Sequence, residues 1–281
     1  MLRRPCPECG MSVDPEILAY YEHGFERDRL TSRRQRIEFL RIQDLLRRYL
    51  PAPPATVLDV GGGAGVHALP LAAAGYQVHL IDPVPLHIEQ ASADSLAASA
   101  PLASAALGDA RQLRAGDDTV DAVLLLGPLY HLTSAADRAA ALGEARRVTR
   151  PGGTVFAKAL LRFYPVFEDF AAGLQSSPGW LERTTRFLAD GQYRNPGGDP
   201  SRFTTGYFHR PDELIREVAD AGLELVAFVA PSGIVKLFPG LSESLDTEEG
   251  RGNVTSLLAL LEAEPSLIGA SQNFLAIARV R

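Results

Sequence analysis

Three glycines and a preceding acid are spaced so that they could hold a nucleotide-like ligand. Residues 57–65 read VLDVGGGAG. Gly61, Gly63 and Gly65 are spaced two residues apart, and they follow an apolar run that contains Asp59. Glycines at such positions let the backbone turn sharply and approach a ligand with no side chain between them. The amides would then face a phosphate, or the amino-acid end of an adenosyl cofactor, at a helix N-terminus. The turn alone does not choose between these ligands.

The spacing of the glycines disfavours a dinucleotide. That fingerprint requires glycine or alanine in the sixth place, which here is Val66 counted from Gly61 and His67 counted from Gly62. A carboxylate on the preceding strand, at Asp59, also suits an ammonium better than a pyrophosphate. A nicotinamide-dependent oxidoreductase is therefore a weaker hypothesis.

Two further acids follow the next apolar segments of the chain. Asp82 ends the segment HLID, and Asp109 lies in the sequence Gly108-Asp109-Ala110. An acid in the first position can accept the hydroxyls of a ribose, and one in the second would lie near the exocyclic amine of an adenine. Either acid alone would be read as a surface residue, but three acids at three successive strand ends favour an adenosine-containing cofactor.

Two histidines are candidates for proton transfer. His131 ends the sequence GPLYH after the fourth predicted strand, at the edge where open α/β sheets bind ligands. We expect His131 to act as a base or a substrate contact, because histidine exchanges protons near neutral pH. Tyr130 would shape the floor of the pocket, and His209, in GYFHRP, could face the acceptor. The structural alternatives are that His131 caps or packs a helix and that His209 belongs to a turn.

The remaining histidines and the cysteines are not assigned to a site. We expect His23, His67, His79 and His87 to be helix, turn or surface residues. The pair in Cys6-Pro7-Glu8-Cys9 suggests zinc, but a structural zinc site needs four ligands and the sequence has no second pair. No metal is predicted.

The elements that must position these residues alternate short apolar strands with helices. This pattern predicts a doubly wound α/β domain with a mostly parallel, Rossmann-like sheet covered on both faces. Two predicted helices are Ala135–Val148 and Pro211–Ala221, a third is centred near Leu257–Leu261, and a turn is expected at residues 150–153. The predicted strands are Thr56–Val60, Gln77–Asp82, Ala103–Leu107, Ala122–Leu126, Thr154–Ala159, Leu223–Val229 and Asn273–Val280.

Four parts are expected along the chain. Residues 1–50 would form an N-terminal helical cap with two or three helices, and residues 51–160 the cofactor-binding core. Residues 161–206, rich in aromatic residues and glycine, would form an insertion after the fifth strand that serves as a lid over the active edge. Residues 207–281 would complete the sheet.

Composition excludes several classes of function. The 281 residues are 46% hydrophobic and 22% charged, with a net charge of -6, which is typical of a globular protein and unlike nucleic-acid binders with their basic surfaces. Neither a secretory signal nor an apolar run of membrane-spanning length is visible. We therefore expect a cytoplasmic protein, as a monomer or a homodimer.

From Val57 to Lys158 the chain resembles the class I S-adenosylmethionine-dependent methyltransferase family. The motifs VLDVGGGAG, HLID, GDA, DAVLLLGPLYHL and RVTRPGGTVF stand in the family's order and spacing. The resemblance implies a seven-stranded sheet with its last strand antiparallel and S-adenosylmethionine as the cofactor. The cofactor contacts it implies are Gly61, Gly63 and Gly65 near the methionine part, Asp82 on the ribose, and Asp109 with Ala110 beside the adenine. Pro83 and Leu126 are further candidate cofactor contacts, as are Tyr21 and Arg29 from a helix that would fold over the cofactor. The alternative for Arg29 is a solvated arginine on a basic helix face.

The expected reaction is methyl transfer to a small-molecule acceptor such as a natural product or a peptide end. Such a transfer is an in-line displacement at carbon, so the protein acts mainly by positioning the reactants. Oxygen, nitrogen and carbon acceptors all remain open. The alternative is a regulatory protein of the same fold that binds S-adenosylmethionine without turnover.

Overall fold

A single seven-stranded sheet forms the centre of the protein. The computed structural model describes residues 14–24, 35–195, 203–238 and 241–281. The strand order is β3-β2-β1-β4-β5-β9-β8, and β9 runs antiparallel to both of its neighbours while the other strands are parallel. This confirms the predicted fold. The strands are β1 (Thr56–Val60), β2 (Gln77–Asp82), β3 (Ser104–Leu107), β4 (Val120–Leu125), β5 (Thr149–Leu160), β8 (Leu223–Val229) and β9 (Asn273–Val280).

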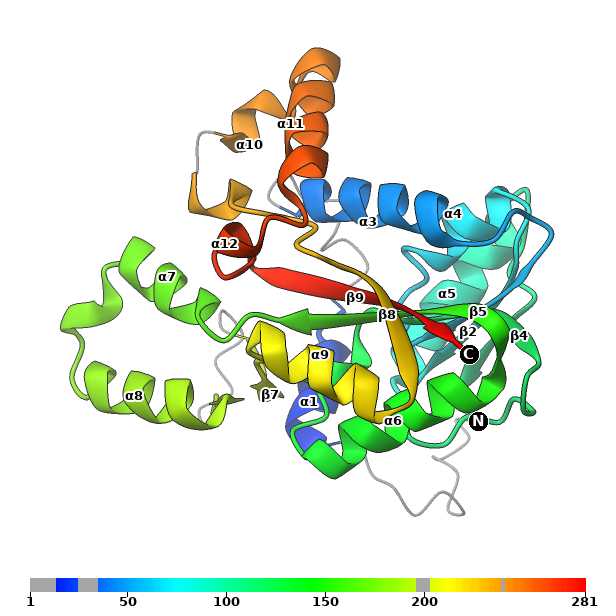
Figure 1. Ribbon diagram of the computed structural model, residues 1–281, viewed down its shortest axis with the longest axis horizontal. Coiled ribbons are helices and arrows are strands. Elements are labelled where there is room, and N and C mark those ends of the chain that lie inside the picture. Colours follow the sequence, from blue (N-terminus) through cyan, green and yellow to red (C-terminus); the bar gives the residue numbers. More distant parts are fainter. Residues whose placement is uncertain (1–13, 25–34, 196–202, 239–240) are drawn as a thin grey trace.

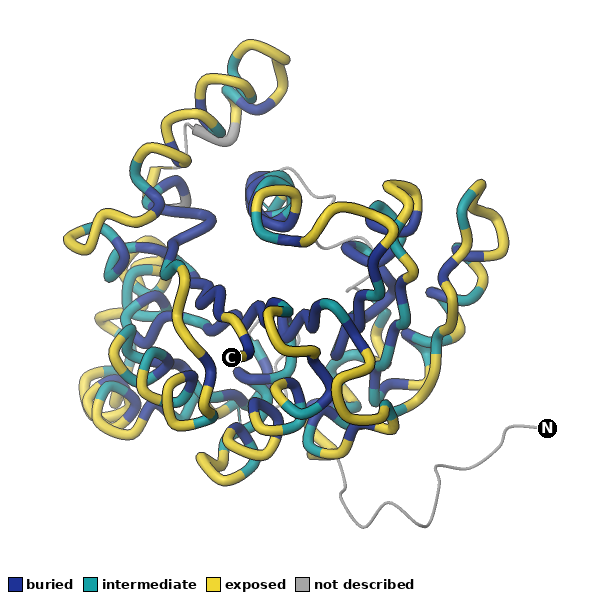
Figure 2. The backbone as a smooth tube through the Cα atoms, turned by 45° about the vertical axis from the view of Figure 1, so that its right-hand side comes forward, coloured by how far each residue is buried: buried dark blue, intermediate teal, exposed yellow. Residues whose placement is uncertain are grey.

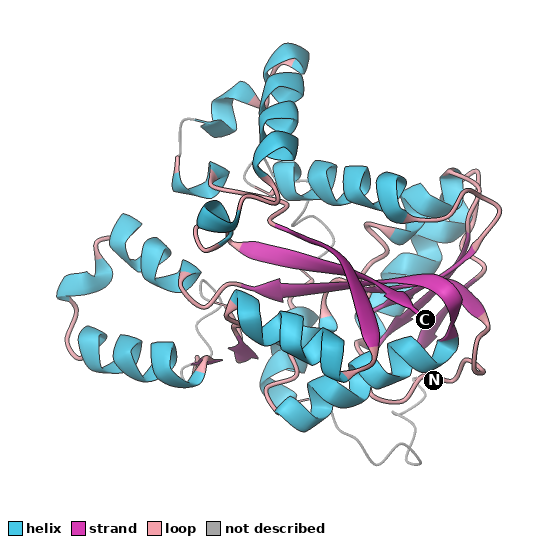
Figure 3. Cartoon of the chain, viewed as in Figure 1, coloured by secondary structure: helices cyan, strands magenta, loops and turns pink. Residues whose placement is uncertain are grey.

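Helices cover both faces of the sheet (Figures 1 and 3). One face packs against α3 (Arg36–Tyr49), α4 (Ala68–Ala73) and α5 (Pro85–Ala97). The other packs against α6 (Ala135–Val148) and α9 (Pro211–Asp220). Figure 2 shows the buried strands in the middle and the exposed sides of the helices outside.

Alternation along the strands produces the two cores. In β1, Val57 belongs to the apolar cluster on the α3 side and Leu58 to the cluster on the α6 side, as expected when successive side chains point to opposite faces. Both faces are covered, so the central strands read mainly as apolar runs, with few polar positions such as Asp59 in β1.

The described parts outside this core are mainly helical. The N-terminal region supplies α1 (Pro15–Glu22), and the insertion after β5 holds α7 (Tyr164–Ala171) and α8 (Trp180–Asp190), which Figure 1 shows standing away from the sheet. A second insertion, between β8 and β9, holds α10 (Leu241–Ser244), α11 (Glu248–Leu261) and α12 (Pro265–Ile268). A short two-stranded sheet pairs β6 (Gln192–Tyr193) with β7 (Gly206–Tyr207).

The turn predicted at residues 150–153 is not a separate turn. These residues lie inside β5, where the register with β4 jumps from Val120 opposite Thr149 to Ala122 opposite Thr154. Gly152 takes a positive φ of 79° there, a backbone conformation that glycine adopts without strain. The proline and glycines therefore mark an irregularity of the strand. Across the described ranges, no helix combines the length and apolarity needed to cross a membrane.

Candidate functional site

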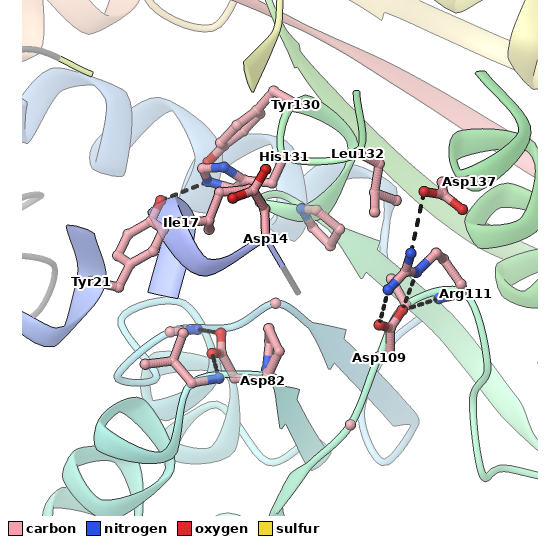
Figure 4. A pocket seen from close by; sticks show the side chains of 18 of the residues that line it. Asp14, Ile17, Tyr21, Asp82, Asp109, Arg111, Tyr130, His131, Leu132 and Asp137 are labelled. Atoms are coloured by element: carbon pink, nitrogen blue, oxygen red, sulfur yellow. Dashed lines mark hydrogen bonds and ion pairs between the residues drawn. The ribbon is translucent and has the colours of Figure 1, made fainter. Parts of the chain in front are cut away.

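A pocket of about 430 Å³ opens at the carboxyl ends of the parallel strands. Its walls come from the loops after β1, β2, β3 and β4 and from α1 (Figure 4). This is the edge where open α/β sheets bind ligands. The pocket lining includes these predicted site residues: Tyr21, Gly61, Gly63, Asp82, Pro83, Asp109, Ala110, Tyr130 and His131.

The glycine turn after β1 adopts the backbone that its sequence predicts. Gly61 and Gly63 have φ values of 67° and 58°, in the left-handed region where a side chain would be strained. A Cβ atom on Gly61 would lie 2.9 Å from the ring of Pro128, so the turn also packs tightly on the loop after β4. Gly65 is not part of the pocket lining and has a φ of 87°, so glycine is favoured there by its backbone conformation.

Asp82 is fixed at the end of β2 by backbone and side-chain donors. Its Oδ2 accepts a hydrogen bond from the Gly63 amide at 2.9 Å, and its Oδ1 accepts one from the Val84 amide at 2.9 Å. The Nδ1 of His87 lies 2.9 Å from the same Oδ1. The carboxylate therefore joins the glycine turn to the start of α5.

His87 is a pocket residue that the sequence interpretation missed. It lies in the first turn of α5, lines the pocket and is only 3% exposed. Its position five residues after Asp82 was the available signal, because side chains in a first helical turn point back toward the helix N-terminus. His87 is a helix residue as expected, but it is buried at the site.

Asp109 is paired with an arginine two residues further along the chain. Its Oδ2 accepts from Nη2 of Arg111 at 2.6 Å, its Oδ1 accepts from Nε at 2.9 Å, and Arg111 also reaches Asp137 at 3.2 Å. Burial pushes the pKa of Asp109 up, but the hydrogen bonds and charge of Arg111 outweigh it and hold this pKa below its usual value. Arg111 and Asp137 line the pocket and were not predicted.

Asp59 lies behind the glycine turn instead of facing the pocket. It is 1% exposed and not part of the lining, and a Cβ atom on Gly62 would lie 2.8 Å from its Oδ2. Burial raises the pKa of Asp59 to about 7, the charge of Asp82 adds to this rise and Lys158 opposes it. The expected direct contact between Asp59 and a ligand ammonium is therefore not what this geometry provides. Leu126 likewise packs in the core on the α3 side, away from the lining.

Helix α1 covers one side of the pocket and contacts the candidate base. The hydroxyl of Tyr21 lies 2.7 Å from Nε2 of His131, and its ring packs edge-on against both His131 and His87. Asp14 and Ile17 also line the pocket from this segment (Figure 4). Arg29, predicted from the same region, lies outside the described residues.

His131 and Tyr130 lie where the loop after β4 meets the pocket. A 3-10 turn, Pro128–Tyr130, follows β4 and ends at His131. The two rings are 4.7 Å apart, and the ring of Phe203 stacks on His131 at 5.6 Å. Lys158 holds its Nζ 5.8 Å from the centre of the Tyr130 ring. The imidazole thus lies among aromatic rings beside the cavity.

His209 does not reach this pocket. It is fully buried, its Nε2 lies 3.1 Å from Oε2 of Glu217, and the ring of Tyr207 packs against it at 4.7 Å. Burial lowers the pKa of His209, which opposes protonation. Its backbone bridges to Leu161, so the structural alternative describes this residue and its prediction as a catalytic residue is not supported.

The described part of the insertion adds nothing to the lining of the pocket. Its lid role stays a prediction, although Phe203 contacts the rings of Tyr130 and His131. No cluster of three or more metal-binding side chains occurs within the described ranges. Cys6 and Cys9 lie outside them.

The comparisons with known proteins agree with this geometry. Residues 57–153 match a family model described as a methyltransferase domain. This match agrees with the class I S-adenosylmethionine-dependent methyltransferase family that the sequence resembles. The match supports the predicted resemblance and, with it, S-adenosylmethionine as the cofactor.

The relatives that this chain matches include two proteins that are both named ubiquinone biosynthesis O-methyltransferase. The protein of Methylobacterium sp. (strain 4-46) is 31% identical over 180 residues, which cover 62% of this chain and 61% of the relative. That of Methylocella silvestris is 35% identical over 192 residues, which cover 65% of this chain and 64% of the relative. The chain thus spans a little under two thirds of these curated relatives.

A solved structure shares the fold at lower identity. A SAM-dependent methyltransferase from Methanosarcina mazei is 19% identical, with a TM-score of 0.56 over 84% of this chain and 96% of that chain.

Proposed function

We propose that this chain is an enzyme that transfers the methyl group of S-adenosylmethionine to a small-molecule acceptor. The observation that carries the proposal is the meeting of the glycine turn, Asp82 and Asp109 with His131 in one pocket. The first three suit the cofactor, and the histidine lies beside the space left for an acceptor. The Methyltransferase-domain match over residues 57–153 supports the same reading.

The charges of the pocket suit a cationic cofactor. Asp14, Asp82, Asp109 and Asp137 line it, with Arg111 as the cation among them. S-adenosylmethionine carries a sulfonium and an ammonium, so an acidic lining favours its binding. The turn at Gly61 and Gly63 would hold the methionine part, Asp82 the ribose, and Asp109 with Ala110 the adenine.

The reaction needs positioning more than activation. When bound, S-adenosylmethionine would supply its methyl group to an acceptor held in line with the carbon-sulfur bond, and the electron pair of that bond would remain on sulfur in S-adenosylhomocysteine. A hydroxyl acceptor would release its proton to Nε2 of His131, the atom that contacts Tyr21 in this structure. The names of the two curated relatives, O-methyltransferases, favour an oxygen acceptor.

Calorimetric titration with S-adenosylmethionine tests the cofactor. We expect binding to the unaltered protein and its loss in Gly63→Val, because the side chain would be strained at the positive φ of Gly63. Asp82→Ala should lose it as well. Absence of binding by the unaltered protein at millimolar cofactor would refute the proposal.

An acceptor library with a mass readout for one added methyl group tests the transfer. The rival function, a regulatory protein without turnover, predicts tight cofactor binding with no methylated product from any acceptor. His131→Asn should keep cofactor binding and lower kcat by about 100-fold, a value typical of lost general base catalysis. A wild-type kcat in this variant would remove His131 from the chemistry. The cytoplasmic location and the oligomeric state stay predictions.

A further inference from the structure

Asp82 has almost no hydrogen-bonding capacity left for a ligand. An ionised carboxylate offers about four acceptor positions. The amide of Val84 and the ring of His87 use two of them at Oδ1, and the amide of Gly63 uses one at Oδ2. About one position remains, whereas the ribose of the cofactor presents two hydroxyl donors.

The geometry of His87 provides the missing acceptor. Because an ionised carboxylate only accepts, Nδ1 of His87 must carry the hydrogen in its bond to Asp82, and in the neutral ring Nε2 then holds a lone pair. This Nε2 is buried and has no hydrogen-bond partner among the residues that the structure describes. A buried polar atom without a partner calls for an explanation, and a ligand is one.

The surroundings of His87 fix the direction of its ring. The residue lines the pocket and is 3% exposed. The ring of Tyr21 packs edge-on against it at 5.2 Å, while Asp82 holds the opposite nitrogen. The imidazole is thus held by two neighbours from different elements before any ligand arrives, which lowers the cost of ordering it.

We infer that His87 is a cofactor-binding residue whose Nε2 accepts a hydrogen bond from one ribose hydroxyl, while Asp82 accepts from the other. This rests on the proposed function, since it assumes that an adenosyl cofactor occupies the pocket. His87 thereby has two roles, because its Nδ1 also orients the carboxylate that holds the ribose.

The test pairs changes in His87 with changes in the ligand. S-adenosylhomocysteine and its 2′-deoxy and 3′-deoxy analogues are titrated calorimetrically into the unaltered protein and into two variants. His87→Asn can keep the donor to Asp82 but places no acceptor where Nε2 lies. His87→Gln can place its amide oxygen near the Nε2 position but does not donate to Asp82. The two variants therefore separate the two roles.

We expect His87→Asn to bind S-adenosylhomocysteine about tenfold more weakly, the effect of losing one hydrogen bond. The affinity of His87→Asn should stay the same when one of the two ribose hydroxyls is removed from the ligand. The affinity of the unaltered protein should fall about tenfold for that same deoxy analogue. His87→Gln should retain most of the affinity and the sensitivity. Equal affinity of His87→Asn and the unaltered protein for that analogue also shows that the variant is folded.

Two results would overturn the inference. One is a His87→Asn variant that distinguishes the deoxy analogues as the unaltered protein does. The other is wild-type affinity in His87→Asn with weak binding in His87→Gln, which would limit His87 to orienting Asp82. Failure of the unaltered protein to bind S-adenosylhomocysteine at all would instead refute the proposed function, and this inference with it.

Discussion

The buried carboxyl of Asp59 links the stability of the protein to pH. Burial raises its pKa to about 7, so the folded state holds a proton that the unfolded state releases near pH 4. The free energy of unfolding should therefore fall as the pH rises from about 4 through about 7. The raised pKa corresponds to a loss of at most about 4 kcal/mol.

Urea unfolding across this pH range checks the prediction. Asp59→Asn should remove most of the decline, so that the variant gains stability relative to the unaltered protein at about pH 8 and not at about pH 4. Asp220→Asn, at an exposed acid on α9, is the matched control and should leave the pH profile unchanged. Parallel profiles for Asp59→Asn and the unaltered protein would contradict the prediction.

The amide of Asn273 is a second buried group that weakens the fold. Asn273 is 1% exposed, and neither Oδ1 nor Nδ2 has a hydrogen-bond partner within the described part of the chain. Asn273→Leu, of similar size, should therefore raise the free energy of unfolding by about 1–3 kcal/mol. Thermal and urea unfolding measure it. Asn273→Asp should act in the opposite direction, because it buries a charge, and a less stable Leu variant would show that the amide is satisfied.

Individual site residues were predictable where the backbone decides their place. Gly61 and Gly63 follow a strand and must turn, and Asp82 ends the neighbouring strand, so the topology brings them together. The prediction that Asp59 faces the ligand was wrong, because the alternation of side chains along β1 directs the Asp59 carboxyl to a buried position behind the glycine turn. Arg111 was missed because its pairing with Asp109 depends on the side-chain rotamer of the arginine, which the spacing of residues in the sequence does not predict.

At the scale of elements, a buried ion pair fastens α3 to the sheet. Nζ of Lys158 on β5 lies 2.8 Å from Oε1 of Glu38, and both residues are almost fully buried. Glu38→Gln should lower the free energy of unfolding by about 3–5 kcal/mol, since it leaves the lysine charge without its counter-ion.

A double-mutant cycle separates the pair from its parts. Glu38→Gln combined with Lys158→Met should be more stable than Glu38→Gln alone, because no uncompensated charge remains. Urea unfolding of the two single variants and the double variant gives the coupling energy. Additive losses in the double variant would show that the two charges do not stabilise each other.

Strands were predicted better than their order in the sheet. Thr56–Val60, Gln77–Asp82, Leu223–Val229 and Asn273–Val280 have the predicted bounds, because buried strands are short apolar runs between breakers. The insertion of β9 between β5 and β8 rests on contacts between distant segments, and only the family resemblance indicated an antiparallel strand. Helices α7 and α8 were not predicted, because the aromatic and glycine-rich composition of residues 161–206 was interpreted as a lid and the helical spacing within it was not used.

For the whole molecule, cofactor binding should appear as added thermal stability. A ligand at about 100 times its Kd stabilises the folded state by about 2.7 kcal/mol, which corresponds to a rise in Tm of about 5 °C for a chain of this size. Differential scanning calorimetry with S-adenosylhomocysteine measures it. Reduced nicotinamide dinucleotide serves as the control and should give no rise. A rise with that compound alone would favour the oxidoreductase hypothesis that the glycine spacing disfavours.

The position of β9 in the sheet restricts the order in which the strands can pair during synthesis. Ribosomes deliver the chain from its N-terminus, so β1 to β5 can pair with one another as they emerge. In the described sheet, β8 pairs only with β9, which is translated later. Until residues 273–280 have left the ribosome, β5 exposes an unpaired edge and β8 has no partner. Nascent chains halted before this point should therefore be the ones that need protection from aggregation.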